Sequence, residues 1–243
     1  MRASDWEFKN RALIIGMIFC VSFPLYALDN QNSTAMLANW LAPKWQMNAE
    51  ALARALFAVA TLVLTAAAML RTWGSSYLAS HVVYASAVKS ESLVADGPYR
   101  WVRNPLYFAN VLLAIGFGAM MNRAGFAFAL VAILIFNYRL IFREESELRA
   151  NLGAAYERYA QAVPRLWPLP WPRIASAGSK PNWSAAFKAE AWVWGFAAAV
   201  GAFAITLNII YYFVILGASL ALFWIMSMVL GKAANSRGAG TGH

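Results

Sequence analysis

The chain has 243 residues, of which 61% are hydrophobic and only 13% are charged. It is much more apolar than an average soluble domain. Its apolar residues also gather in runs of about 20, the length that an α-helix needs to cross a bilayer. Composition therefore excludes an ordinary soluble domain. The net charge of +9 indicates contact with anionic lipid headgroups and requires no nucleic-acid partner.

The apolar runs predict an all-α integral membrane bundle of about six transmembrane helices. The expected spans are residues 12–28, 51–70, 107–121 and 124–142, and two within 191–230. Asn122-Arg123 leaves room only for a tight turn between the third and fourth spans. The uncharged stretch at the end is about twice one span, so Asn208 near its middle is the expected turn.

Lysine and arginine predict the orientation of the bundle. With the N-terminus inside, 17 of the 20 basic residues fall in inner segments, and only Lys44, Arg54 and Arg123 fall in outer ones. Cytoplasmic segments carry this excess in membrane proteins. We therefore expect both termini in the cytoplasm, in a bacterial inner (plasma) membrane.

The connections between spans differ in what they offer. Residues 29–50 form the main outer connection, and Trp40 and Trp45 predict an interfacial loop with aromatic anchors. Only two inner segments, 71–106 and 143–190, are long enough to carry a site. We expect that site to face the cytoplasm.

The inventory of reactive side chains excludes several chemistries. The histidines are His81 and His243, and the single cysteine, Cys20, lies in a span. No zinc site, Cys-His pair or Ser-His-Asp triad can be assembled from them, and no metal is expected. Neither a P-loop nor a Gly-x-Gly-x-x-Gly turn after a strand is present.

The first informative stretch, residues 93–107, leads into the third span. Pro105 suits the first turn of that helix, with Asn104 as its N-cap. Arg100 and Arg103 then stand beside a helix N-terminus, which favours an anionic group such as the carboxylate of a bound amino-acid moiety. The alternative is that these arginines only contact lipid phosphates.

The second stretch, residues 143–165, continues the fourth span into the cytoplasm as a helix. At about 100° per residue, one face carries a carboxylate within an apolar stripe. The stripe consists of Glu145, Leu148, Leu152, Tyr156, Tyr159 and Val163. Buried carboxylates need cations or hydrogen-bond donors, so a ligand could bind there, with Glu144 reaching it from the side. The alternative is an ordinary ion pair between Glu145 and Arg149.

Together the two stretches resemble the isoprenylcysteine carboxyl methyltransferase family, which is related to phospholipid methyltransferases. That family carries Gly-Pro-Tyr-x-x-Val-Arg-His-Pro-x-Tyr followed by a helix with Glu-Glu. Matching residues here are 97–107, Glu144-Glu145, Leu148, Gly153, Tyr156, Tyr159, Val163-Pro164 and, more loosely, Arg71-Thr72-Trp73-Gly74. The resemblance covers about residues 51–165.

This resemblance implies S-adenosylmethionine as cofactor, held between the two stretches. It also implies contact with membrane lipids and a lipophilic or small-molecule methyl acceptor that arrives through the bilayer. The implied cofactor residues are Leu93, Val94, Gly97, Pro98, Tyr99, Arg103, Asn104, Pro105, Tyr107, Glu144 and Glu145. The implied catalytic residues are Arg103, Asn104 and Glu145. Whether the acceptor offers a carboxylate, an amine or a thiol stays open. An amine or thiol must lose a proton, for which Glu144, Glu145 or Tyr99 is nearest.

The sequence departs from the family in two places. Asn104 replaces the histidine, and asparagine can donate a hydrogen bond but cannot act as a base. Beyond Arg165 the chain adds a linker and two spans, which could shape a substrate portal, a dimer contact or a membrane anchor. The expected organisation is an N-terminal helix and outer loop (1–50), a methyltransferase core (51–170), and a linker with a C-terminal hairpin and flexible tail (171–243).

Two rival functions belong to other classes. A sterol-type membrane reductase resembles this architecture and uses a nicotinamide cofactor. A transporter or other non-catalytic membrane protein is the second rival. Transport of a charged solute requires ionisable residues in mid-span, and the expected spans contain none there.

Overall fold

The computed structural model describes the backbone of residues 2–88 and 93–239 and the side chains of residues 2–78, 93–226 and 228. Five residues used in the sequence analysis lie outside the described side chains: His81, Lys89, Lys232, Arg237 and His243. Within the described ranges the regular structure is helical, which confirms the predicted all-α class.

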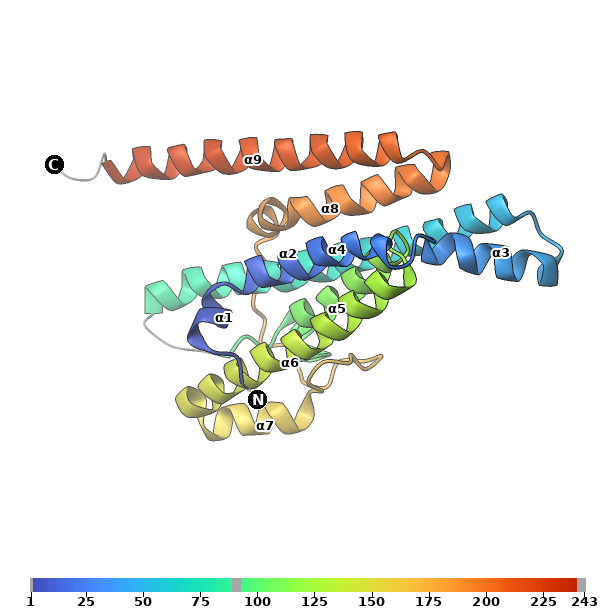
Figure 1. Cartoon of the computed structure of the whole chain (residues 1–243). Coiled ribbons are helices and arrows are strands. Elements are labelled where there is room, and N and C mark those ends of the chain that lie inside the picture. Colours follow the sequence, from blue (N-terminus) through green and yellow to red (C-terminus); the bar gives the residue numbers. More distant parts are fainter. Residues whose placement is uncertain (1, 89–92, 240–243) are drawn as a thin grey trace.

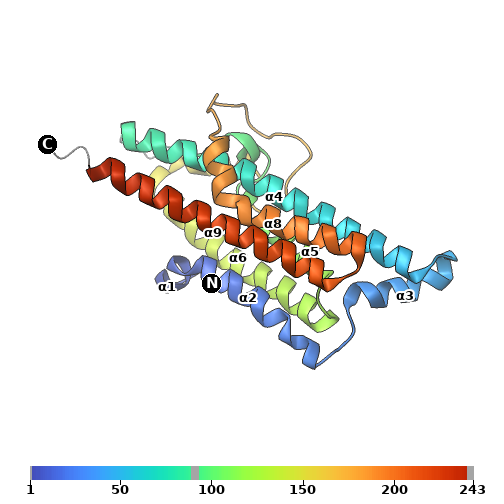
Figure 2. The same ribbon diagram turned by 90° about the horizontal axis from the view of Figure 1, so that it is seen from above.

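Long helices form the bundle (Figure 1). In chain order they and the short helices are α1 (Asp5–Lys9), α2 (Arg11–Ser22), η1 (Pro24–Ala27), α3 (Ser33–Trp45), α4 (Ala49–Val88), η2 (Gly97–Arg100), α5 (Pro105–Gly118), α6 (Arg123–Leu152), α7 (Ala154–Ala162), α8 (Trp183–Thr206) and α9 (Ile209–Ala239). The central helix α4 packs against α3, α5 and α8, while α6 packs against α5 and α2 (Figure 2). Helix α9 packs mainly on α8. We call the two ends of the bundle the α3 end and the α7 end.

Six apolar helical segments lie where spans were predicted, but within the described residues only four are long and apolar enough to cross a membrane. These four are Ala49–Leu78, Arg123–Leu152, Trp183–Thr206 and Ile209–Met226. Helix α5 has 14 residues and therefore rises about 21 Å, less than the roughly 30 Å of a hydrocarbon core. Helix α2 stops before Pro24, which has no N–H to continue it. The protein is thus an integral membrane protein, and six complete crossings remain a prediction.

Both predicted turns are present. Asn122 caps α6 by accepting a hydrogen bond from the Gly125 N–H at 2.7 Å, and its Nδ2 donates to the Leu25 carbonyl at 2.6 Å. Asn208 separates α8 from α9, where its Oδ1 accepts from the Ile210 N–H at 2.9 Å. Short polar caps of this kind satisfy helix ends that have no intrahelical partner.

The prediction of a loop over residues 29–50 is wrong, because α3 occupies most of it. Asn32 caps this helix, and Ala38 and Ala42 are buried together with Leu52 of α4. Small residues four apart let two helices approach closely. Both tryptophans of α3 are exposed.

Two helices run further than hydropathy predicted, and a third element breaks earlier. Helix α4 continues past residue 70 to Val88, and α8 begins at Trp183, before the uncharged run. The expected continuous helix after residue 143 ends at Leu152. Gly153 has φ +51° and ψ −125°, a conformation that only glycine adopts readily. The predicted stripe is therefore divided between α6 and α7.

Asp96 fastens the long connection between α7 and α8 to the segment before α5. Its buried carboxylate accepts hydrogen bonds from Ser176 Oγ (2.7 Å) and from the N–H groups of Ala177 and Ser179 (both 2.9 Å). Burial alone would raise the pKa of Asp96, but these hydrogen bonds outweigh it and hold the pKa below its ordinary value. The connection is thus held in place by an ionised side chain.

Replacing Gly153 with alanine should destabilise the protein by about 1–3 kcal/mol, because a Cβ is strained at this backbone conformation. No atom lies within 4 Å of that Cβ, so crowding contributes nothing. Gly217→Ala is the matched control, because Gly217 also has open space but lies in a regular helix. Thermal unfolding in detergent measures both variants, and an equal effect of the two substitutions would contradict the role of Gly153.

Replacing Asp96 with asparagine should lower the free energy of unfolding by about 1–3 kcal/mol, because the amide nitrogen of asparagine would face backbone N–H donors. The depressed pKa means that the stabilisation is complete above the ordinary pKa of 3.8 and is lost as pH falls through the folded-state value. The free energy of unfolding should therefore be measured for the wild type and for Asp96→Asn between pH 6 and pH 3, and the difference between them should become smaller toward pH 3. A difference that does not change with pH would show that the charge of Asp96 is not the source of the stabilisation.

Candidate functional site

The two predicted segments meet at the α7 end. The Arg103 N–H donates to the Pro164 carbonyl at 2.8 Å, and Asn104 Nδ2 donates to the Arg165 carbonyl at 2.9 Å. Asn104 is the N-cap residue of α5 and Pro105 its first residue, as predicted, although the Asn104 side chain bonds to Arg165 instead of capping the helix. These bonds join the residues before α5 to those that follow α7.

Glu145 is the centre of this junction. Its carboxylate is almost fully buried, with side-chain exposure of 1%, and contacts three guanidinium groups. The nitrogen–oxygen distances are 3.0 Å to Arg165, 3.3 Å to Arg103 and 3.4 Å to Arg149. The pair with Arg149 is the alternative considered from the sequence, but it is the longest and most exposed of the three. A buried carboxylate persists only when cations or donors surround it in this way.

Arg103 is only half paired. Its side chain is 8% exposed, and one nitrogen, Nη2, contacts Glu145. Its Nε and Nη1 are buried without a hydrogen-bond partner among the described residues. Buried donors normally find a partner, and leaving one unsatisfied costs about 1–3 kcal/mol. Two such donors on one guanidinium are suited to an anionic ligand.

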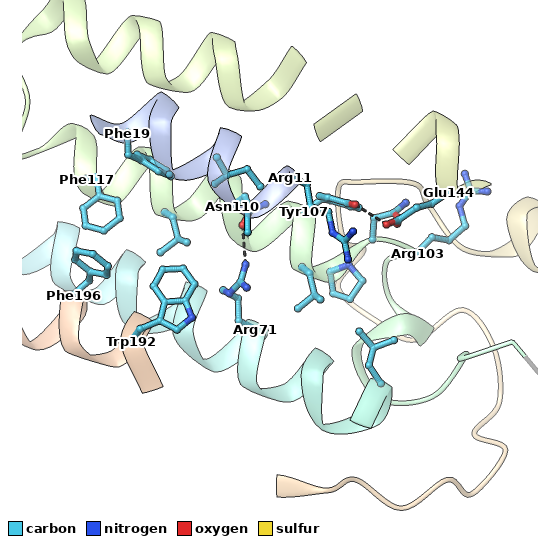
Figure 3. Close-up of a pocket in the computed structure, with 18 of the residues that line it drawn as sticks. Arg11, Phe19, Arg71, Arg103, Tyr107, Asn110, Phe117, Glu144, Trp192 and Phe196 are labelled. Atoms are coloured by element: carbon cyan, nitrogen blue, oxygen red, sulfur yellow. Dashed lines mark hydrogen bonds between the residues drawn. The ribbon is translucent and has the colours of Figure 1, made fainter. Parts of the chain in front are cut away.

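Glu144 lies on the neighbouring position of α6 and points elsewhere. Its Oε1 accepts a hydrogen bond from the Tyr107 hydroxyl at 2.8 Å, which links α6 to the first turn of α5 (Figure 3). The two adjacent glutamates therefore differ in their surroundings. Glu145 forms ion pairs with arginines, and the Glu144 carboxylate lines the cavity described next.

A cavity of about 1340 Å³ extends from this junction into the bundle. Arg103, Tyr107 and Glu144 line its polar part, which we call the cofactor end because the sequence analysis expects a cofactor beside these residues (Figure 3). Aromatic side chains of α2, α5 and α8 line the other part, which we call the acceptor end because a lipophilic acceptor is expected from the sequence. They include Phe19, Phe117, Trp192 and Phe196, and side chains of α9 complete this wall.

The predicted cofactor residues divide into two groups. Those that line the cavity are Leu93, Val94, Tyr99, Arg103, Asn104, Pro105, Tyr107 and Glu144. Gly97, Pro98 and Glu145 are absent from its wall. Gly97 has φ +58° and lies against the Tyr77 ring, so it shapes the turn.

Tyr99 and Tyr159 form part of the same wall. The Tyr159 hydroxyl donates to the Tyr99 carbonyl at 2.8 Å. Burial raises the pKa of both phenols, so they stay protonated at neutral pH. Tyr99, considered from the sequence as a proton acceptor, is therefore a poor base.

A second buried ion pair lies between the two ends of the cavity. Arg71 Nε is 2.7 Å from Glu190 Oε2, and Ser75 Oγ donates to Glu190 Oε1 at 2.6 Å. Arg71 Nη1 also donates to Asn110 Oδ1 at 2.8 Å, and Asn110 Nδ2 lies 3.4 Å from Asn137 Oδ1. These polar groups cross from α8 through α4 and α5 to α6.

Sequence reasoning missed this network. The expected spans ended at residue 70 and began at residue 191, so Arg71 and Glu190 fell just outside them, whereas the observed helices α4 and α8 contain both residues. One signal was available, because Glu190 is the only acidic residue after Glu157. An isolated acid next to a long apolar run is costly to bury without a partner.

Metal binding has no evident centre in the part of the chain that the structure describes. No group of three or more His, Cys, Asp or Glu side chains comes together there.

Three curated relatives share part of this sequence. The nickel-cobalt-cadmium resistance protein NccN of Alcaligenes xylosoxydans is 32% identical over 114 residues, covering 47% of this chain and 50% of that protein. The cobalt-zinc-cadmium resistance protein CzcN of Cupriavidus metallidurans is 31% identical over 86 residues, 35% of this chain and 40% of that protein. The protein-S-isoprenylcysteine O-methyltransferase of Schizosaccharomyces pombe is 35% identical over 92 residues, 37% of this chain and 39% of that protein. The chain thus spans half or less of the length of each relative.

A family model locates the similarity within the chain. No solved structure matches the protein. The model of the isoprenylcysteine carboxyl methyltransferase (ICMT) family matches residues 52–150, which include α5, most of α4, and Glu144 and Glu145 of α6. This range contains residues 71–74, 97–107 and Glu144-Glu145, on which the resemblance rested, and ends before the matching residues at 153–164. Residues 52–150 of this chain are thus similar to the isoprenylcysteine carboxyl methyltransferase family.

Proposed function

We propose that this membrane protein is a methyltransferase that uses S-adenosylmethionine and methylates an acceptor with an apolar tail. The observation that carries the proposal is Arg103, whose buried Nε and Nη1 lack a partner among the described residues at the cofactor end of the cavity. The similarity of residues 52–150 to the ICMT family supports it, because ICMT enzymes use S-adenosylmethionine as methyl donor.

The chemistry of the cofactor end fits this molecule. A carboxylate suits the two unpaired donors of Arg103. An ammonium group or ribose hydroxyls suit Glu144, and Leu93 and Val94 offer apolar surface to the adenine. When bound, S-adenosylmethionine supplies a methyl carbon that is electrophilic because it is attached to a sulfonium.

The protein's own residues then act by placement. Methyl transfer is an in-line displacement, for which the main requirements are alignment and exclusion of water. Glu145 orients Arg103, the Tyr107 hydroxyl orients Glu144, and Asn104 fixes the segment through Arg165. Arg103 is the predicted catalytic residue that would contact the cofactor, while Asn104 and Glu145 are positioning residues in this proposal.

We also propose that the α7 end faces the cytoplasm of a bacterial inner membrane. The support is the distribution of 17 basic residues against three between inner and outer segments. Helix α1 lies at the α7 end, opposite α3 (Figure 1). This orientation gives the site access to a soluble cofactor.

Isothermal titration in detergent tests the proposal against a nicotinamide-dependent reductase. S-adenosylhomocysteine should bind and NADPH should not, and the reverse result would exclude methyl transfer. Arg103→Lys should weaken S-adenosylhomocysteine binding by about 10- to 100-fold, because lysine lacks the planar fork that serves Glu145 and a ligand at once. Arg158→Lys, on the exposed side of α7, is the control and should bind normally.

Glu145→Gln should both destabilise the protein and weaken cofactor binding. Loss of the buried carboxylate leaves Arg103 and Arg165 uncompensated, which costs about 3–5 kcal/mol for a broken buried pair. Arg149→Gln is the matched control, because Arg149 is 40% exposed and lies 3.4 Å from the same carboxylate. Thermal unfolding with and without S-adenosylhomocysteine separates the two effects. Wild-type affinity in the Glu145 variant would show that this residue does not position Arg103.

A further inference from the structure

The charge of Arg71 is already neutralised where the acceptor end of the cavity begins. Its guanidinium contacts Glu190 at 2.7 Å and Asn110 at 2.8 Å, and the two ion-pair partners have side-chain exposures of 16% and 7%. The guanidinium carbon of Arg71 also lies over the Trp192 ring, 5.2 Å from its centroid. A guanidinium paired with a carboxylate in this way has little attraction left for an anionic acceptor.

The remaining charges of the cavity lie elsewhere. Among the described lining residues, the other charged side chains are Arg11, Arg103, Glu144 and Glu147. Arg103 belongs to the cofactor end, and Arg11 is an exposed residue whose charge interacts with that of Glu144. No described cation is therefore left at the acceptor end to compensate a carboxylate, and a buried carboxylate without compensation is costly.

Aromatic side chains make up much of the wall at the acceptor end. Phe117 lies between Phe19 and Phe196, with centroid separations of 5.3 Å and 4.9 Å in edge-to-face geometry (Figure 3). The face of an aromatic ring attracts a cation, whereas an anion meets only weakly positive ring edges. Such a wall favours a positive charge that develops on an acceptor.

From these observations we propose that the acceptor of this site is an apolar-tailed amine, not a carboxylate. The inference rests on the proposed methyl transfer. Desolvation in the cavity favours the uncharged amine. The nitrogen lone pair forms a bond to the methyl carbon, the carbon–sulfur bond breaks with its electrons passing to sulfur, and the resulting ammonium gives its proton to water after release. The net charge of the site stays constant during transfer, so no base is needed in that step.

Photolabelling of the cofactor-free protein in phosphatidylcholine nanodiscs tests the binding part. Two probes share a 16-carbon tail with a diazirine and differ only in an amine or a carboxylate head. The amine probe should label cavity-facing positions of α8 and α9, such as Trp192 and Phe196, about tenfold more strongly. Excess hexadecylamine should displace that label, which distinguishes the cavity from the lipid-facing surface.

Glu190→Gln tests the origin of the preference. It removes the charge that neutralises Arg71, so the amine-to-carboxylate ratio should fall about tenfold or more, both in labelling and in methyl transfer from labelled cofactor. Glu190→Asp keeps the negative charge and should retain the preference for the amine over the carboxylate. This variant therefore distinguishes an effect of the charge from an effect of the substitution on folding. Glu50→Gln removes an exposed glutamate paired with Arg54 at the other end of α4 and should leave the ratio unchanged.

Stronger labelling or faster methylation of the carboxylate by the wild-type protein would overturn the inference. Faster transfer to a thiol with the same tail would also overturn it, as would an unchanged ratio in Glu190→Gln that folds normally. Absence of both S-adenosylhomocysteine binding and transfer would instead reject the proposed function, even if the amine probe labelled the cavity.

Discussion

The site depends on one buried carboxylate. Glu145 gathers arginines from three places in the chain: the segment before α5, helix α6, and the segment after α7. Without this charge the guanidinium groups would repel one another at the α7 end, and Arg103 would lose the contact that orients it. The unpaired donors of Arg103 matter only because Glu145 holds the rest of that side chain in a fixed position.

A second buried carboxylate connects the family-matched residues to the C-terminal hairpin of α8 and α9. Glu190 of α8 lies outside residues 52–150, yet it pairs with Arg71 inside them. The hairpin is therefore not merely appended, because its carboxylate sets the charge of a cavity wall and its aromatic side chains cover the acceptor end. Of the roles considered for the hairpin from the sequence, this geometry supports the shaping of a substrate portal.

Local patterns predicted local features well. Apolar runs placed the helical segments, and Asn122, Asn208 and Pro105 marked helix boundaries because caps and proline act on their immediate neighbours. Hydropathy failed where charged residues satisfy each other across helices, since Arg71 and Glu190 let α4 and α8 continue beyond their apolar runs. The two motifs were expected to meet, and they do. The contribution of Arg165 was not predictable, because a contact between distant residues leaves no periodic pattern.

The position of the acceptor end has a kinetic consequence. Its walls include α2 and α9, whose remaining apolar side chains are largely exposed on the surface that meets lipid. Under the proposed function, an acceptor that enters between such helices is dissolved in the bilayer, so its effective concentration is its mole fraction among lipids, not its amount per volume of buffer. Adding inert lipid would slow turnover by surface dilution at constant total acceptor. The soluble cofactor, by contrast, would still follow ordinary bulk saturation.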